Sequence, residues 1–406
     1  MPELIEKIKA LANQFKPDVV NFRRHLHAHP ELSFREFETT AYIASVLGRI
    51  GIEIDMRFSE TGLVGHIYGN NPSAKTIAIR ADIDALPILE ENKVDYASKV
   101  NGVMHACGHD VHTASQLGTA MILQHLKSEF EGTIKLIFQP GEEVLPGGAL
   151  KMIQAGVLQH QPPSRIFAQH VFPTLETGKV GFRVGKYMAS TDELHIEVVG
   201  KGGHAALPNS YNNPLLMASA LLLELNQRFQ PYFNLSEPTV LAFGKIEGLG
   251  ATNIIPEKVL LQGTLRTLDE KWRQEAHGLI REACNKIATA YNGKIVPNII
   301  IGYPCLVNDA QATFDLRKAA ENYLGKENVV DLDLRMTAED FSYFSHELPA
   351  CFYRLGTGNR SKGITANVHT STFDIDEEAL EIGMGLMAYG VLSELNTTIS
   401  NKTNSN

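Results

Sequence analysis

The sequence contains little cysteine and has no paired cysteine motif. Four of the 406 residues are cysteines, and they are spread along the chain as Cys107, Cys284, Cys305 and Cys351. Cysteines this far apart do not form a C-x-x-C pair and do not indicate a disulfide framework. In a reducing compartment they are expected to be thiols. With 44% hydrophobic residues, the chain is long enough to form a sizeable core without cross-links.

The sequence also lacks a surplus of positive charge and any long apolar run. Its net charge is −9, and no basic patch stands out, so nucleic acid is a poor candidate partner. No apolar run reaches the roughly 18 residues that a membrane span needs. The amino-terminal segment, Met-Pro-Glu-Leu-Ile-Glu-Lys, does not show the basic-then-apolar order of a signal peptide. We therefore expect a cytoplasmic protein that uses neither a membrane nor nucleic acid.

Strand-like and helix-like segments alternate in the first 185 residues. The predicted strands cover residues 63–68, 76–80, 132–138 and 165–170, and predicted helices cover 4–15, 37–47, 111–126 and 149–155. This alternation predicts an α/β fold with a mostly parallel sheet that helices cover on both faces. The same pattern returns from about Pro304, so we assign 1–185 and 304–406 to one domain.

Residues 186–303 follow a different pattern. Glu193 to Val199 alternates strictly between polar and apolar residues, which is typical of a half-buried strand. The elements that follow give the order β-α-β-β-α-β, which is the split-βαβ, ferredoxin-like motif. We predict a small α+β domain inserted into the larger one.

Two adjacent acids, Glu142 and Glu143, follow the predicted strand that ends at Phe138. Open α/β sheets place ligands at the carboxyl ends of their strands. A metal ion bound to one carboxylate would offset the repulsion between the two and leave the other to move a proton. The alternative is a solvated loop that happens to carry two acids, because such pairs are common on surfaces.

Further metal-binding residue types follow other predicted strands or lie in glycine-containing loops. Cys107 and His109 are two residues apart, which in an extended segment directs both side chains to the same side. A set of cysteine, histidine and carboxylate suits Zn, Ni, Co or Mn. Each residue alone has a plain structural explanation, such as a buried thiol or a loop histidine. Their joint occurrence predicts a metal site, and the candidates are Asp82, Asp84, Cys107, His109, Glu142, Glu143, His170 and His369.

Seven motifs in order carry a resemblance that covers nearly the whole chain. They are Arg24-His-Leu-His-Ala-His-Pro-Glu-Leu, Arg80-Ala-Asp-Ile-Asp-Ala-Leu-Pro, Met104-His-Ala-Cys-Gly-His-Asp-Val-His-Thr-Ala, Gln139-Pro-Gly-Glu-Glu, Gly200-Lys-Gly-Gly-His-Ala-Ala, Ala338-Glu-Asp-Phe and Asn367-Val-His. The chain resembles the metal-dependent amidohydrolase, aminoacylase and carboxypeptidase family, which includes hippurate hydrolases, auxin-conjugate hydrolases and N-acetyl-diaminopimelate deacetylases.

The resemblance implies a site with two divalent metal ions (Zn, Mn, Ni or Co). It implies that Cys107 bridges the ions, that Glu142 is the acid/base, and that the inserted domain, 186–303, is a lid that dimerises. It implies that His204 donates to the oxyanion from the lid, with the partner subunit as one possible source. The implied metal ligands are Cys107, His109, Glu143, His170 and His369.

Four further residues complete the predicted site. A planar arginine is the best clamp for a substrate carboxylate, and Arg266 stands where relatives carry one, with Asn253 as an additional hydrogen-bond donor. Asp84 and Asp110 are expected to orient metal-bound histidines from behind. Asp82 stands where distant relatives carry a metal-binding histidine, and since Cys107 is present we assign it no ligand role.

We therefore predict a metal-dependent hydrolase that cleaves the amide of N-acyl or N-aroyl amino acids. A dipeptidase or metallocarboxypeptidase of the same family is the near alternative. A cysteine hydrolase that uses Cys107 with His109 or His112 is a second class, and a non-catalytic metal-binding protein is a third. The sequence does not identify the acyl group, the amino acid or the native metal.

Overall fold

The computed structural model describes residues 2–403, which form two compact units. Unit 1 consists of residues 2–185, 307–333 and 343–403, and unit 2 consists of Lys186–Leu306 with Leu334–Ser342. Met1 and residues 404–406, which we assigned to the first domain, lie outside the described range. Residues 304–306 and 334–342, which we also assigned there, group with unit 2. Their backbone pairs with it, since Arg335 N–H donates to Tyr187 O at 2.9 Å.

Unit 1 contains an eight-stranded sheet. Its four neighbouring central strands are parallel, whereas β1, β2 and β6 run antiparallel to neighbours. The central strands β4 and β16 are buried along their whole length, as expected for strands that helices cover on both faces. The order is β1 (Glu53–Asp55), β2 (Leu63–Tyr68), β4 (Thr133–Gln139), β3 (Thr76–Asp82), β5 (Arg165–Glu176), β16 (Ala350–Gly358), β6 (Val180–Phe182) and β15 (Val329–Asp331).

Helices α1, α3 and α9 pack against one another in unit 1, and α3 also packs on β3. The first helix is longer than predicted and includes His25 and His27. None of the helices in the described part of the chain is long and apolar enough to cross a bilayer. The helices of this unit are α1 (Pro2–Ala28), α2 (Phe37–Arg49), α3 (His109–His125), α4 (Gly148–Gln154), α7 (Ala310–Leu324), α8 (Ser342–Glu347) and α9 (Glu378–Thr403).

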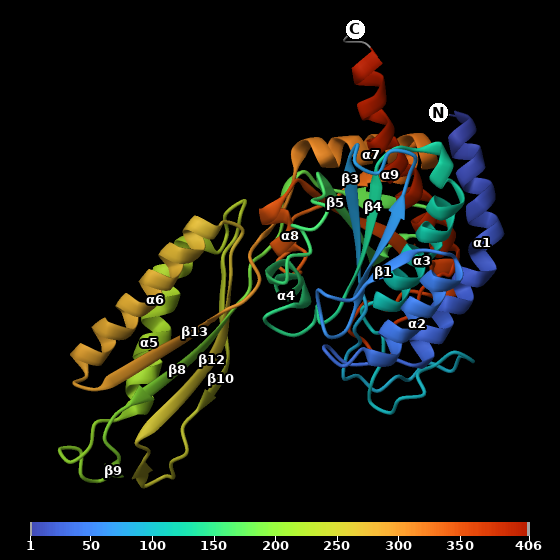
Figure 1. The fold of residues 1–406 in the computed structure, drawn as a ribbon. Helices are drawn as coiled ribbons and strands as arrows, with labels where there is room; N and C mark the ends of the chain where they lie inside the picture. Colours follow the sequence, from blue (N-terminus) through green and yellow to red (C-terminus); the bar gives the residue numbers. More distant parts are fainter. Residues whose placement is uncertain (1, 404–406) are drawn as a thin grey trace. The chain divides into compact units, whose positions relative to one another are not determined.

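Unit 2 contains a four-stranded antiparallel sheet with two helices packed on one face (Figure 1). The alternating residues Leu194, Ile196 and Val198 of β8 are buried in its core. The order along the sheet is β10-β12-β8-β13, and the chain order is β8 (Asp192–Val199), α5 (Pro214–Phe229), β10 (Val240–Glu247), β12 (Lys258–Arg266), α6 (Glu270–Ala290) and β13 (Lys294–Ile301).

Short elements connect these larger ones. A small ladder pairs β9 with β11 in unit 2. The remaining bounds are β7 (Gly185–Met188), β9 (Gly203–His204), β11 (Ile254–Ile255), β14 (Leu306–Asn308), η1 (Lys127–Glu129), η2 (Gln230–Tyr232), η3 (Lys326–Asn328) and η4 (Arg360–Lys362).

Candidate metal centre

A sharp turn at Gly108 places Cys107 and His109 in unit 1. Gly108 has φ 82° and ψ 19°, and His109 is the first residue of α3. The prediction that these residues share an extended segment is therefore wrong. A Cβ at Gly108 would lie 2.6 Å from Val171 Cγ2, so this position requires glycine both for its φ and for the close approach of β5.

The other four predicted ligands converge around the Cys107 thiol. His369 Nε2 lies 3.3 Å and His170 Nε2 lies 3.5 Å from Cys107 Sγ. Glu143 Oε1 lies 3.3 Å from His369 Nε2 and 3.9 Å from His109 Nε2. The ligand atoms form two groups of three, each within 4.8 Å, namely Cys107, His109, His170 and Cys107, Glu143, His369. Cys107 belongs to both groups, which is the position that a bridging ligand occupies.

The ring tautomers also suit metal binding. His170 Nδ1–H donates to Val171 O at 2.8 Å, and His109 Nδ1–H donates to Asp84 O at 2.9 Å. In their neutral form, both rings turn a lone pair on Nε2 toward the thiol and the carboxylate. Within residues 2–403, the buried atom His109 Nε2 has no hydrogen-bond partner. Buried polar atoms of this kind need a partner, and a divalent cation would supply it.

His369 is held by its backbone in a rarely populated conformation. Its φ is 63°, which is uncommon for a residue other than glycine. Its N–H donates to Ala106 O at 2.7 Å, and this bond ties the loop directly beside Cys107. Strained backbone of this kind concentrates at functional sites because the surrounding structure must maintain it.

The protonation states of Cys107, Glu143 and His369 depend on one another. Burial raises the pKa of the Cys107 thiol, and the neighbouring Glu143 charge raises it further. Hydrogen bonds to Cys107 and Glu143 raise the pKa of His369 to about 10. A proton on His369 thus provides the positive charge between a thiol and a carboxylate. A bound cation would replace that proton and deprotonate the thiol, since metal binding displaces protons from its ligands.

Asp84 connects two of the ligands, whereas Asp110 lies elsewhere. Asp84 Oδ1 lies 3.1 Å from His109 Nδ1, and its Oδ2 accepts from Glu143 N–H at 3.0 Å. Asp110 accepts instead from Arg23 Nε at 2.8 Å and lies 2.8 Å from His27 Nδ1. We predicted that both aspartates orient metal-binding histidines. Of the two, Asp84 contacts a predicted ligand, His109, whereas Asp110 contacts His27, which is not one.

Sequence reasoning missed the contribution of Asp82 and His112. Val171 N–H donates to His112 Nε2 at 2.9 Å, so the neutral ring carries its proton on Nδ1 and donates it to Asp82 Oδ1 at 2.5 Å. These contacts fix the backbone of β5 at Val171, the residue that follows His170. The spacing of His109 and His112 on a helix, three residues apart, is the signal that both lie on one face.

Glu142 lies beside two of the predicted ligands, His109 and Glu143. It is 7% exposed, and its carboxylate is within 4.8 Å of ligand atoms of His109 and Glu143. A buried carboxylate at this distance is within reach of a water molecule held at the same ligands, so the arrangement allows proton transfer.

The remaining predicted residues belong to unit 2 and lie in two places. Asn253 is next to His204, because Ala205 N–H donates to Asn253 O at 3.0 Å. Arg266 is the last residue of β12, whose first residue Lys258 pairs with Val199 near the His204 end. Eight strand steps of about 3.3 Å put Arg266 roughly 26 Å away from that end. The unit therefore groups Asn253 with His204 and not with Arg266.

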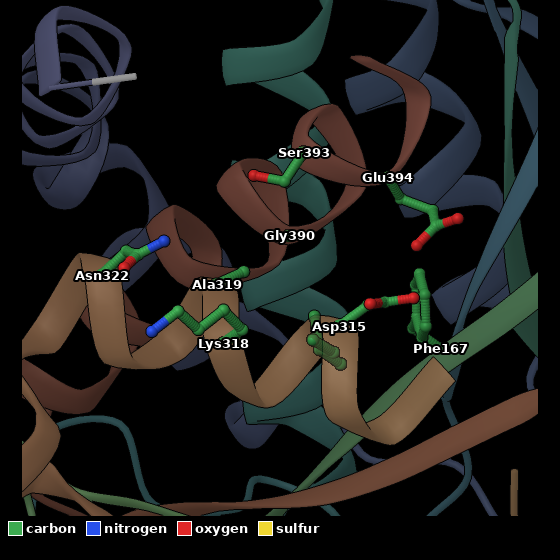
Figure 2. Close-up of a pocket in the computed structure, with 9 residues that line it drawn as sticks. Phe167, Asp315, Lys318, Ala319, Asn322, Gly390, Ser393 and Glu394 are labelled. Atoms are coloured by element: carbon green, nitrogen blue, oxygen red, sulfur yellow. The ribbon is translucent and has the colours of Figure 1, made fainter. Parts of the chain in front are cut away.

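A separate pocket of about 130 Å³ lies beside α7 and α9 (Figure 2). Its two acids, Asp315 and Glu394, both accept hydrogen bonds from Arg165 Nη1, at 2.7 and 2.5 Å. Arg165 is the first residue of β5, whereas His170 lies five residues further along. The charges of this pocket are thus compensated, and it lies toward the amino end of β5.

Comparisons with known proteins agree on one family. The family model described as peptidase family M20/M25/M40 matches residues 78–392. The chain is 39% identical to an N-acyl-L-amino acid amidohydrolase of Geobacillus stearothermophilus, over 75% of this chain and 81% of that protein. It is 36% identical to thermostable carboxypeptidase 2 of Saccharolobus solfataricus, over 94% and 96%. A solved Bacillus subtilis structure, titled a dinuclear metal binding peptidase from the M20 family, matches with TM-score 0.83 and 35% identity over 95% and 99%.

Proposed function

This chain belongs to the peptidase family M20/M25/M40, and from that premise we propose that it hydrolyses the amide bond of N-acyl or N-aroyl amino acids. The products are a carboxylic acid and a free amino acid. The observation that carries the proposal is the convergence of three imidazole Nε2 atoms and the Glu143 carboxylate on the Cys107 thiol. This arrangement gives the chain a place for two cations beside a separate carboxylate.

Two divalent cations held by the five ligands would polarise the amide carbonyl and lower the pKa of a water molecule. The remaining chemistry belongs to side chains. Glu142 takes the proton of the attacking water and passes it to the leaving amine, which a carboxylate can do only if it is not used as a ligand. Asp84 keeps His109 and Glu143 aligned, because one carboxylate contacts both residues.

His204 is the proposed donor to the oxyanion. Ala206 N–H donates to His204 Nδ1 at 3.1 Å, so the neutral ring carries its proton on Nε2 and can donate it. The residue is exposed, as a donor that acts on a bound substrate should be. Preorganised donors of this kind stabilise the charge that develops on the carbonyl oxygen.

Arg266 is the proposed clamp for the substrate carboxylate. It is half-buried, and burial lowers the pKa of its guanidinium. Within the described residues, the one hydrogen bond of its side chain is donated to Met336 O at 3.4 Å, and no acid forms an ion pair with it. A guanidinium without an acidic partner is suited to bind a carboxylate from a ligand in two-point geometry.

We further propose that unit 2 is a lid through which two copies of the chain dimerise in the cytoplasm. His204 and Arg266 lie too far apart for one chain to apply both to a small substrate, so His204 has to come from the partner subunit. Strand β10 is an edge strand, and Leu223, Ile246 and Leu249 of unit 2 are 72%, 53% and 86% exposed. Exposed apolar side chains beside an open strand edge favour association.

Specific observations bear on two alternatives, one for and one against. A carboxypeptidase or dipeptidase activity would use the same centre, and the similarity to a thermostable carboxypeptidase supports it. The second alternative is a cysteine hydrolase that uses Cys107 with His109 or His112 as its base. His112 is not available for that role, because Val171 N–H and Asp82 occupy its two nitrogens, and burial keeps the thiol protonated by raising its pKa.

A substrate panel tests the proposal. The purified chain would be loaded with Zn, Mn, Co or Ni and offered acetyl, benzoyl, indole-acetyl and long-chain amides of several amino acids, together with dipeptides. We expect the release of free amino acid from at least one acyl series. Hydrolysis of dipeptides alone would favour the carboxypeptidase alternative, and no turnover of any compound would contradict the aminoacylase proposal.

A further inference from the structure

A buried carboxylate that none of the seven motifs accounts for contacts the loop that carries Glu142 and Glu143. Glu36 directly precedes α2 and is 0% exposed. Its Oε1 accepts from Gly141 N–H at 2.8 Å, and its Oε2 accepts from Thr61 Oγ1 at 2.7 Å. Gly141 is 105 residues away in the sequence and immediately precedes the two acids.

The peptide groups on both sides of Gly141 are fixed. Glu36 holds its N–H, and Gly148 N–H donates to its carbonyl at 3.0 Å. Gly141 has φ 61°, and a Cβ there would lie 2.4 Å from the ring of Phe34. The Phe34 ring is itself held in place, because Lys151 Nζ lies 3.6 Å from the centre of the ring. The loop can therefore leave the Glu36 carboxylate only by moving several neighbours.

The segment that contains Glu36 also contacts the other support of the metal ligands. Ser33 Oγ donates to Asp84 Oδ2 at 2.6 Å, the same oxygen that accepts from Glu143 N–H. Residues 33–36 thus hold the Glu142–Glu143 loop at two points, through Gly141 and through Asp84. Small errors in such supports are costly because a catalytic group must be placed to a fraction of an ångström.

We infer that Glu36 is a positioning residue, whose carboxylate sets the direction of the Gly141 N–H and thereby aims Glu142 at the substrate and Glu143 at the metal centre. This inference rests on the proposed function for the role of Glu142, but the effect on Glu143 is independent of any substrate. Glu36 itself touches neither substrate nor metal in this role.

The chemistry of the contact requires an acceptor at Oε1. The carboxylate accepts from two donors, the Gly141 N–H and the Thr61 O–H. Within the described residues no lysine, arginine or histidine pairs with Glu36, and burial together with the Asp84 charge raises its pKa to about 7. A buried acid without a cationic partner is costly for the fold, which favours a positioning role over a stabilising one.

Three variants separate positioning from stability. Glu36→Ala removes the acceptor, Glu36→Gln keeps an amide oxygen that can accept from Gly141 N–H, and Thr61→Val removes the other partner of the carboxylate. Each variant would be characterised by its melting temperature, by a titration of the metal-free protein with Co(II) followed by absorption, and by kcat and KM on the best substrate of the panel.

We expect Glu36→Ala to weaken Co(II) binding and lower kcat roughly 10- to 100-fold, the range seen when outer partners of metal ligands are removed, with KM changed little. Glu36→Gln should restore both to within about 3-fold of the wild type. Thr61→Val should lower the melting temperature but leave Co(II) binding and kcat in place.

Two results would overturn the inference. One is Glu36→Ala with unchanged Co(II) binding and kcat, and the other is Glu36→Gln as impaired as Glu36→Ala. Should Glu36→Ala fail to fold, Glu36→Gln and Thr61→Val still test the inference. The positioning role requires Glu36→Gln to match the wild type in Co(II) binding and kcat. If the wild type turns over no substrate, the proposed function fails, and the Co(II) titration still tests Glu36.

Discussion

His204 should act on the active site of the other subunit, and mixed dimers reveal whether it does. The structure places Arg266 at one end of β12 and the His204 ladder at the other, about 26 Å apart at 3.3 Å per residue. A substrate of two residues spans only about 7 Å. One chain therefore cannot clamp such a substrate with Arg266 and donate to its oxyanion with His204.

The test uses two variants that should each be inactive, His204→Ala and Glu142→Ala. In a mixed dimer, a site that takes Glu142 from one chain and His204 from the other is intact, while the second site lacks both. Random pairing of a symmetric dimer makes half of the dimers mixed, so the mixture should recover about one quarter of the wild-type activity.

Co-expression with two different affinity tags, followed by sequential purification, isolates the mixed dimer itself, which should show about half of the wild-type activity. Each variant alone, treated in the same way, is the control. If the mixed dimer is as inactive as its parents, then His204 does not act on the active site of the other subunit.

Three further results follow from the described contacts. Glu142→Gln should lower kcat by roughly 10²- to 10⁴-fold, the usual contribution of a general acid/base, while metal analysis still finds two cations, and near-normal turnover would remove Glu142 from the mechanism. His112→Ala removes the acceptor of Val171 N–H and should weaken metal binding roughly 10- to 100-fold; His112→Gln keeps an acceptor, so equal losses in both variants would contradict this role. In the metal-free protein the pKa of Glu36 is raised from 4.5 to about 7, so its contribution to stability is present below about pH 4.5 and is lost as the pH rises through 7. Relative to Glu36→Gln, the wild type should lose about 3 kcal/mol between pH 4 and pH 8 in urea unfolding, and a difference that does not change with pH would refute this.

The predicted ligands that the structure brings together lie close to one another in the sequence or follow the ends of strands. Cys107 and His109 are two residues apart, and Glu143 follows the carboxyl end of β4, the edge at which α/β sheets place their ligands. The peptidase family M20/M25/M40 match agrees with the predicted family. The fold follows for the same reason, since apolar runs and alternation report directly on burial.

The supports of these ligands could not be predicted in the same way. Glu36 lies 105 residues from Gly141, and an acid before a helix has many more common explanations, such as capping. The partner of Asp110 is Arg23 on α1, which depends on how α1 packs on α3 and not on any local pattern. The pairing of β9 with β11 brings Asn253 beside His204, whereas the sequence suggested that Asn253 would act together with Arg266.

Removal of metal from the enzyme tests the central claim most directly. Amino-acid release from the best N-acyl substrate would be measured before chelation, after exhaustive chelation, and after Mn, Zn, Co or Ni is added back, with metal content determined at each step. We predict that activity disappears with the metal and returns when about two cations bind per subunit. Activity that survives complete removal of metal but is abolished by alkylation of Cys107 would contradict the metal mechanism and favour a cysteine hydrolase.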